Sequence, residues 1–155
     1  MRGQQEVRAL RQRLDAAFDR AKALIATDVE LQADFARYLC VLVSGYVETS
    51  VAELAMEYCR NRAQPHVSNY AGRELSRLQN LKAERLLQVV GAFSQEWRKE
   101  VESHIEGRRK DALNAVVDLR NKIAHGESVT LTYSRIREYY ASVQEIVDFL
   151  GTKFA

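Results

Sequence analysis

The residues best suited to chemistry lie in one short segment, Leu119 to Gly126, which reads Leu-Arg-Asn-Lys-Ile-Ala-His-Gly. The segment places Arg120, Asn121 and His125 at the C-terminal end of an expected helix, which Gly126 is suited to end. A guanidinium fork matches phosphate oxygens, and an imidazole can take or give a proton near neutral pH. RNA cleavage through attack by its own 2′-hydroxyl needs both capacities when no metal takes part. The segment therefore holds the residue types that metal-independent RNA cleavage needs, with Asn121 placed to hold an oxygen of the RNA or to orient the histidine.

The spacing of Arg120 and His125 imposes a geometric condition on such a site. Positions five residues apart lie about 140° from one another around a helix, so the two side chains would not share a face of an unbroken helix. In one solution the helix ends at His125, which then turns towards the arginine. In the other, two chains related by a two-fold axis each contribute both residues to a shared cleft. Spacing alone favours ordinary helix capping, because a histidine near a helix C-terminus interacts favourably with the helix dipole.

The sequence contains no pattern typical of other kinds of catalytic site. The histidines are His66, His104 and His125, the cysteines are Cys40 and Cys59, and their spacing matches no zinc site. Paired carboxylates of a two-metal nuclease, a glycine-rich phosphate loop and a nucleophile elbow are not evident. We therefore expect neither a metal nor a cofactor. We expect His66 in a surface loop, and His104 on a solvated helix among glutamates that shift its charge.

The elements that must position the segment are helices, because proline occurs once and strand signals are nearly absent. Apolar periodicity predicts a first helix over about residues 4–27 and a long second helix over about 29–62. A helix over about 108–124 is expected after Gly107, and an extended connector then leads to an amphipathic last helix. Candidate N-caps are Thr27 and Asp28 for the second helix, Ser68, Asn80 and Ser94 for shorter helices, and Thr132 or Ser134 for the last. We predict an all-α fold, a bundle of about five to six helices, in one domain over residues 1–155.

The second expected helix is apolar on nearly every face, which is typical of the centre of a bundle or of a subunit interface. Glu48 is the exception, because it falls in the most apolar stretch, where an unpaired carboxylate would be costly. Either it pairs with an arginine such as Arg120, or it reaches the surface beside the interface. We expect a homodimer whose interface is formed by the second helix and the helix that carries Arg120.

Composition indicates an ordinary soluble domain, with 155 residues, 46% hydrophobic and 28% charged, and a net charge of +2. We expect no apolar run long enough to span a bilayer and no signal peptide at the N-terminus. Cys40 and Cys59, about 28 Å apart on one expected helix, are too far apart to form a disulfide. These observations predict a cytoplasmic protein without a membrane partner.

Basic residues near the segment are candidate RNA contacts, although the net charge is low for a non-specific nucleic-acid binder. Lys122 lies within the segment, and Arg108 and Arg109 open the same expected helix. Solvated helix faces are the alternative interpretation of such clusters.

The string Arg-Asn-x-x-Ala-His-Gly resembles the Arg-Asn-x-x-x-His signature of HEPN domains, an all-α family that binds nucleotides and RNA. Further segments are similar to the RiboL-PSP type of this family: Ser-Gly-Tyr-Val-Glu-Thr-Ser at 44–50, the segment around Pro65, Val67 and Tyr70, the segment from Phe93 to Trp97, the Val-Thr-Leu connector and the Tyr-Tyr pair of the last helix. The resemblance implies a helical bundle that dimerises with its motif helices facing each other. Carried over by position, Arg120 and His125 would be catalytic, and Asn121 and, less firmly, Glu48 would support them.

The resemblance also implies a function, because many HEPN domains are metal-independent endoribonucleases that act as toxins or as antiviral and stress effectors. We therefore expect an endoribonuclease with RNA as its substrate. A non-catalytic HEPN module that binds RNA, a nucleotide or a protein partner is the alternative, since some HEPN domains keep the fold and do no chemistry. An unrestrained ribonuclease would harm its host, so an antitoxin or a larger defence assembly is an expected partner.

Overall fold

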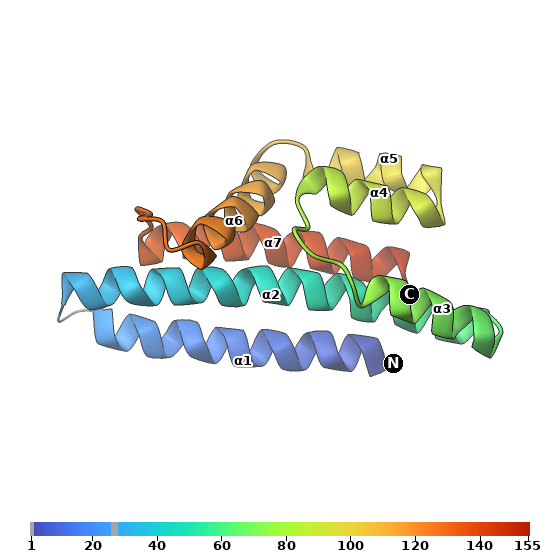
Figure 1. The fold of residues 1–155 in the computed structure, drawn as a ribbon, viewed down its shortest axis with the longest axis horizontal. Helices are drawn as coiled ribbons and strands as arrows, with labels where there is room; N and C mark the ends of the chain where they lie inside the picture. Colours follow the sequence, from blue (N-terminus) through green and yellow to red (C-terminus); the bar gives the residue numbers. More distant parts are fainter. Residues whose placement is uncertain (1, 26–27) are drawn as a thin grey trace.

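The computed structural model describes residues 2–25 and 28–155, and every regular element in these ranges is a helix (Figure 1). The seven helices are α1 (Arg2–Ile25), α2 (Val29–Arg62), α3 (Pro65–Leu75), α4 (Ala83–Phe93), α5 (Gln95–Ile105), α6 (Arg108–Ala124) and α7 (Tyr133–Lys153). The predicted all-α class is confirmed. The seven helices of the described residues exceed the predicted five to six, although the three short helices between α2 and α6 match the three shorter helices for which N-caps were expected.

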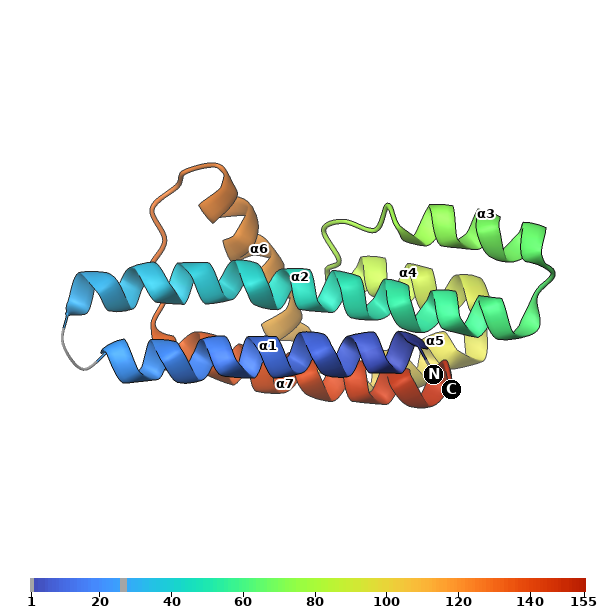
Figure 2. The same ribbon diagram turned by 90° about the horizontal axis from the view of Figure 1, so that it is seen from below.

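The long helices lie side by side, with α2 against both α1 and α7, and α6 crosses α2 obliquely (Figures 1 and 2). One hydrophobic cluster joins these helices, and it includes the fully buried Phe18, Leu39, Leu113 and Tyr140. The ring of Phe18 stacks on that of Tyr140 with 4.8 Å between centroids. Burying a phenylalanine stabilises a fold by about 1.5–3 kcal/mol, so this α1–α7 contact holds the long helices together.

Local capping chemistry sets most helix ends. Asp28 accepts a hydrogen bond from the N–H of Glu30 at 2.9 Å, so α2 begins at Val29 as predicted. Ser94 and Thr132 cap α5 and α7 in the same way, and α6 begins after Gly107, which has a φ of 89°. The predicted cap Thr27, together with the predicted end of the first helix, lies outside the described residues.

Three predictions in the short-helix region are wrong. Ser68 caps no helix but lies within α3, which starts at Pro65, and its hydroxyl donates to the carbonyl of Cys59 at 3.0 Å. His66 is therefore in a helix and not in a loop. Asn80 lies two residues before the N-cap residue of α4 and has a φ of 52°. α3 starts with a proline, which has no N–H that would need a partner, and α4 starts where Asn114 accepts a hydrogen bond from the N–H of Ala83.

The expectation that no apolar run could span a bilayer is also wrong, because α2 is long and apolar enough by length and composition. In the structure, 61% of its most apolar window is buried. A helix in the middle of a soluble bundle has the same composition, and the burial of α2 by its neighbours is consistent with that role.

Candidate functional site

The segment from Leu119 to Gly126, called the Arg120 segment below, forms the last turn of α6 and the turn that ends this helix. Gly126 has a φ of 73°, and its N–H donates to the carbonyl of Ile123 at 3.1 Å. The N–H of Glu127 donates to the carbonyl of Lys122 at 2.9 Å. These two bonds with a left-handed glycine form a Schellman motif, which satisfies carbonyls at a helix end. The predicted role of Gly126 is confirmed, and His125 becomes the C-cap residue.

Arg120 is half-buried, and a neighbouring amide holds its guanidinium. The Nη1 of Arg120 donates to the Oδ1 of Asn121 at 3.3 Å, the one hydrogen bond of its side chain within residues 2–25 and 28–155. The guanidinium forms no ion pair with any carboxylate of the described chain. Its remaining N–H groups are therefore available to an anion such as a phosphate oxygen.

His125 is exposed, and its backbone N–H donates to the carbonyl of Asn121 at 3.1 Å. Its imidazole makes no hydrogen bond in the part of the chain that the structure describes, and none joins it to Arg120. The two residues are separated by about 7.5 Å along the helix axis, at 1.5 Å per residue. Ending the helix leaves the imidazole free in solvent, but it does not bring the imidazole onto the guanidinium within one chain.

Glu48 is half-buried on α2 and has a backbone partner. Its Oε1 accepts a hydrogen bond from the N–H of Asn80 at 3.2 Å, and no described contact joins it to Arg120. The carboxylate thereby anchors the segment that leads into α4, at the point where Asn80 has a positive φ. The supporting role of Glu48 in catalysis stays a prediction.

The other predicted RNA contacts divide between the two ends of α6. Lys122 is exposed in the last turn of α6, on the segment of Arg120. Arg108 and Arg109 lie at the opposite end of α6, about 25 Å from His125 at 1.5 Å per residue. Both donate to Glu145, at 3.0 and 2.7 Å. The structure therefore does not bring Arg108 and Arg109 together with the Arg120 segment.

Three contacts that hold α6 in place were missed from the sequence. The Oδ1 of Asn114 accepts from the N–H of Ala83 at 2.9 Å and thus caps α4, and Lys82 pairs with Asp118 at 2.5 Å. The thiol of Cys40 on α2 lies 3.6 Å from the carbonyl of Val116. Asparagine is a poor helix former in a helix interior, and this was the available signal for Asn114.

His104 lies at the end of α5, and the predicted cause of its charge shift is wrong, because burial, Arg109 and Glu145 act on it and not the glutamates of its own helix. Its ring stacks on Phe149 with 4.0 Å between centroids, and its Nδ1 is buried without a hydrogen-bond partner. Burial and the nearby Arg109 lower the pKa of His104, although Glu145 opposes them. No group of three or more His, Cys, Asp or Glu side chains suited to a metal occurs in residues 2–25 and 28–155.

Comparison with known proteins gives one finding. The RiboL-PSP-HEPN family matches residues 8–155, and this range includes every residue of the Arg120 segment. No curated protein matches the chain, and no solved structure matches it.

Proposed function

Because the chain belongs to the RiboL-PSP-HEPN family, we propose that it is an endoribonuclease that cleaves RNA without a metal. HEPN domains are often ribonucleases or otherwise act on RNA. The observation that carries the proposal is the Arg120 segment, which is intact inside the matched range and ends in an exposed imidazole. The amide of Asn121 holds the guanidinium of the adjacent Arg120. The other N–H groups of this guanidinium are left for a phosphate.

The proposed reaction starts with loss of the proton from the 2′-hydroxyl of the RNA. One imidazole of His125 takes this proton, and the 2′-oxygen then attacks the adjacent phosphorus. The guanidinium of Arg120 offsets the charge of the crowded phosphorane. The bond from phosphorus to the 5′-oxygen breaks, and a protonated imidazole gives this oxygen its proton. The products are a 2′,3′-cyclic phosphate and a free 5′-hydroxyl, so neither water nor a metal enters this step.

A two-fold dimer would bring the guanidinium of one chain beside the imidazole of the other. The Arg120 and His125 of each chain would enter one cleft, with α2 and α6 at the interface. This arrangement accounts for the lack of a hydrogen bond between the two side chains within one chain. We propose further that the protein acts in the cytoplasm as a toxin or as a defence or stress effector. An antitoxin or a larger assembly would then restrain it.

The second candidate is a HEPN module that binds RNA, a nucleotide or a protein partner and does no chemistry. The lack of a hydrogen bond between Arg120 and His125 within one chain favours this candidate as well. The two candidates differ in what His125→Ala removes. Catalysis would be lost in that variant, whereas binding that depends on Arg120 and its neighbouring cations would largely remain.

The test is the chemistry of the products in the presence of a chelator. End-labelled RNA is incubated with wild type, Arg120→Ala, His125→Ala and the control His66→Ala, which changes an exposed histidine on α3. We expect wild type and the control to give products ending in 2′,3′-cyclic phosphate, and the other two variants to give none. RNA with 2′-deoxy sugars at the cleaved positions should resist cleavage. An absolute requirement for magnesium or manganese would refute this mechanism.

Mixing the two inactive variants tests the shared cleft. A dimer of one Arg120→Ala chain and one His125→Ala chain still carries one guanidinium and one imidazole. Part of the activity should return when the two variants are mixed under conditions of subunit exchange. Sedimentation of wild type as a monomer at micromolar concentration would contradict the shared cleft.

A further inference from the structure

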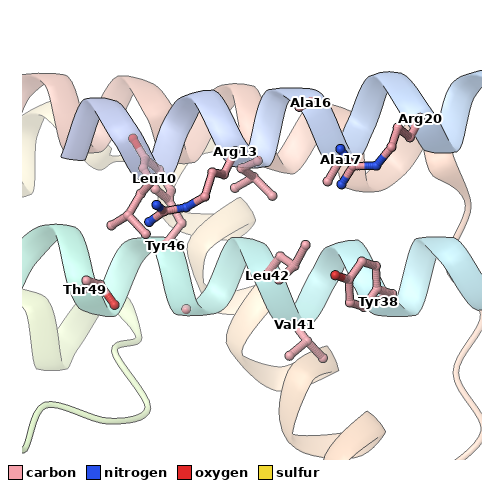
Figure 3. A pocket seen from close by; sticks show the side chains of 12 residues that line it. Leu10, Arg13, Ala16, Ala17, Arg20, Tyr38, Val41, Leu42, Tyr46 and Thr49 are labelled. Atoms are coloured by element: carbon pink, nitrogen blue, oxygen red, sulfur yellow. The ribbon is translucent and has the colours of Figure 1, made fainter. Parts of the chain in front are cut away.

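A groove of about 660 Å³ runs between α1 and α2 and contains no residue of the Arg120 segment (Figure 3). Leucine and alanine side chains of α1 form one wall, and Val41 and Leu42 of α2 form part of the other. Gly45 leaves the backbone of α2 open there, because a Cβ at this position would have no atom within 4 Å. The groove is therefore apolar at its base and open to solvent.

Two arginines of α1 lie over this groove (Figure 3). Arg13 and Arg20 are exposed and seven residues apart, about 10.5 Å along one face of α1. Neither side chain has an ion pair or a hydrogen bond in the described part of the chain, and no Asp or Glu lines the groove. Two cations without a counter-charge favour an anionic ligand.

An aromatic ring lies on the α2 side of the groove. Tyr38 is 54% exposed, and its ring stacks on no other aromatic ring among the described residues. Tyr46 in the same groove differs, because it is buried and its hydroxyl accepts hydrogen bonds from Arg11 at 2.7 and 3.1 Å. Tyr38 is thus the aromatic side chain of the groove whose face is available to a ligand.

We propose that this groove binds single-stranded RNA, with one base stacked on Tyr38 and phosphates on Arg13 and Arg20. A free aromatic ring beside unpaired arginines is the combination that single-strand grooves use. A duplex would not offer a splayed base to the ring. A second copy of the chain fits less well, because a two-fold contact of this groove with itself would bring four unpaired arginines together without an acid.

The stretch of α2 that lines the groove also packs against the helix that carries Arg120. Val41 lines the groove, and the preceding residue, Cys40, contacts the carbonyl of Val116 on α6 at 3.6 Å. Arg120 follows Val116 by four residues, about 6 Å along α6. No residue of α6 lines the groove, so the groove binds RNA whether or not the Arg120 segment cleaves it.

The test measures binding of an uncleavable RNA, so it does not depend on catalysis. A fluorescent 2′-O-methyl single strand of about ten nucleotides, a length within the usual site size, is titrated with the full chain. Tyr38→Ala should weaken binding about 5- to 160-fold, whereas Tyr38→Phe, which keeps the ring, should bind like wild type. Binding weakens as salt rises, and the Arg13→Ala/Arg20→Ala variant should make the slope of log K against log salt less steep by about 1.4, at 0.7 per lost phosphate contact.

Arg8→Ala is the matched control, because Arg8 is an exposed arginine of α1 that lines a different groove, towards α7. It should leave the Tyr38-dependent binding unchanged, and thermal melting should show that all variants are folded. Unchanged RNA affinity and salt slope in the Tyr38 and arginine variants would overturn the proposal. If these variants bind RNA like wild type but sediment with a different coefficient, the groove would be assigned to contact with a second copy of the chain. Equal affinity for a duplex, or for a mononucleotide, would overturn recognition of a single strand.

Discussion

Gly126→Ala tests the turn that presents His125, and its cost can be worked out from the structure. Gly126 has a φ of 73°, a conformation that costs an alanine about 1–2 kcal/mol. A Cβ at this position would have no atom within 4 Å, so steric contact adds nothing to that cost. For a chain of this size, 1 kcal/mol moves Tm by about 2–4 °C, and we expect a fall in Tm of about 2–8 °C.

The same substitution should reduce RNA cleavage by more than its effect on folding. The strained turn weakens the bond from the N–H of Glu127 to the carbonyl of Lys122, and His125 then loses its defined position. A displacement of about 1 Å in a catalytic group can lower the rate on the order of 10²-fold. The assay is cleavage of labelled RNA in a chelator, well below the Tm of the variant.

Two matched variants make the result interpretable. Gly126→Asn should keep most of the stability and activity, because asparagine tolerates the left-handed conformation better than alanine does. Gly151→Ala makes the same change within α7, where a Cβ also meets nothing within 4 Å, and it should raise stability by about 0.5–1 kcal/mol. An unchanged Tm in Gly126→Ala would refute the cost assigned to the turn. Wild-type cleavage by a destabilised Gly126→Ala would refute its role in positioning His125.

Further predictions concern stability and its dependence on pH. Burial and Arg109 lower the pKa of His104, so the folded protein binds fewer protons than the unfolded chain as pH falls below about 6.5. The stability of wild type relative to His104→Gln should therefore fall between pH 7.5 and 5 in urea titrations, and parallel pH profiles of the two proteins would contradict this. The hydroxyl of Tyr140 donates to Asp15 at 2.7 Å, and Tyr140→Phe should lower the free energy of unfolding by about 1–3 kcal/mol. A urea midpoint equal to that of wild type would show that this bond contributes nothing.

Much of the fold was predictable because helix ends depend on local chemistry. The sequence predicted the bounds of α2 and α6, since Asp28 caps one helix and Gly107 and Gly126 delimit the other. The start of α3 was predicted incorrectly, because Ser68 has the composition of a cap but bonds the carbonyl of Cys59 inside a helix. A side chain of this kind fits both roles, and only the packed structure decides between them.

The candidate site was predictable in its residues but not in its surroundings. The types and order of Arg120 and His125 indicated the chemistry, and Gly126 indicated the turn. The partner of Glu48 was not predictable, because it is the backbone N–H of Asn80, 32 residues away, and no side-chain pattern marks such a partner. The cap that Asn114 provides to α4 is likewise a contact between distant parts of the chain.

RNA cleavage in EDTA by wild type and His125→Ala is the most direct test of the central claim. The substrate is a mixed pool of structured RNAs, and binding of the pool is measured for both proteins. We expect wild type to cleave, and His125→Ala to bind the RNA without cleaving it. Equal cleavage by both proteins would contradict the role of His125. Binding without cleavage by either would contradict the nuclease and favour the non-catalytic RNA-binding module.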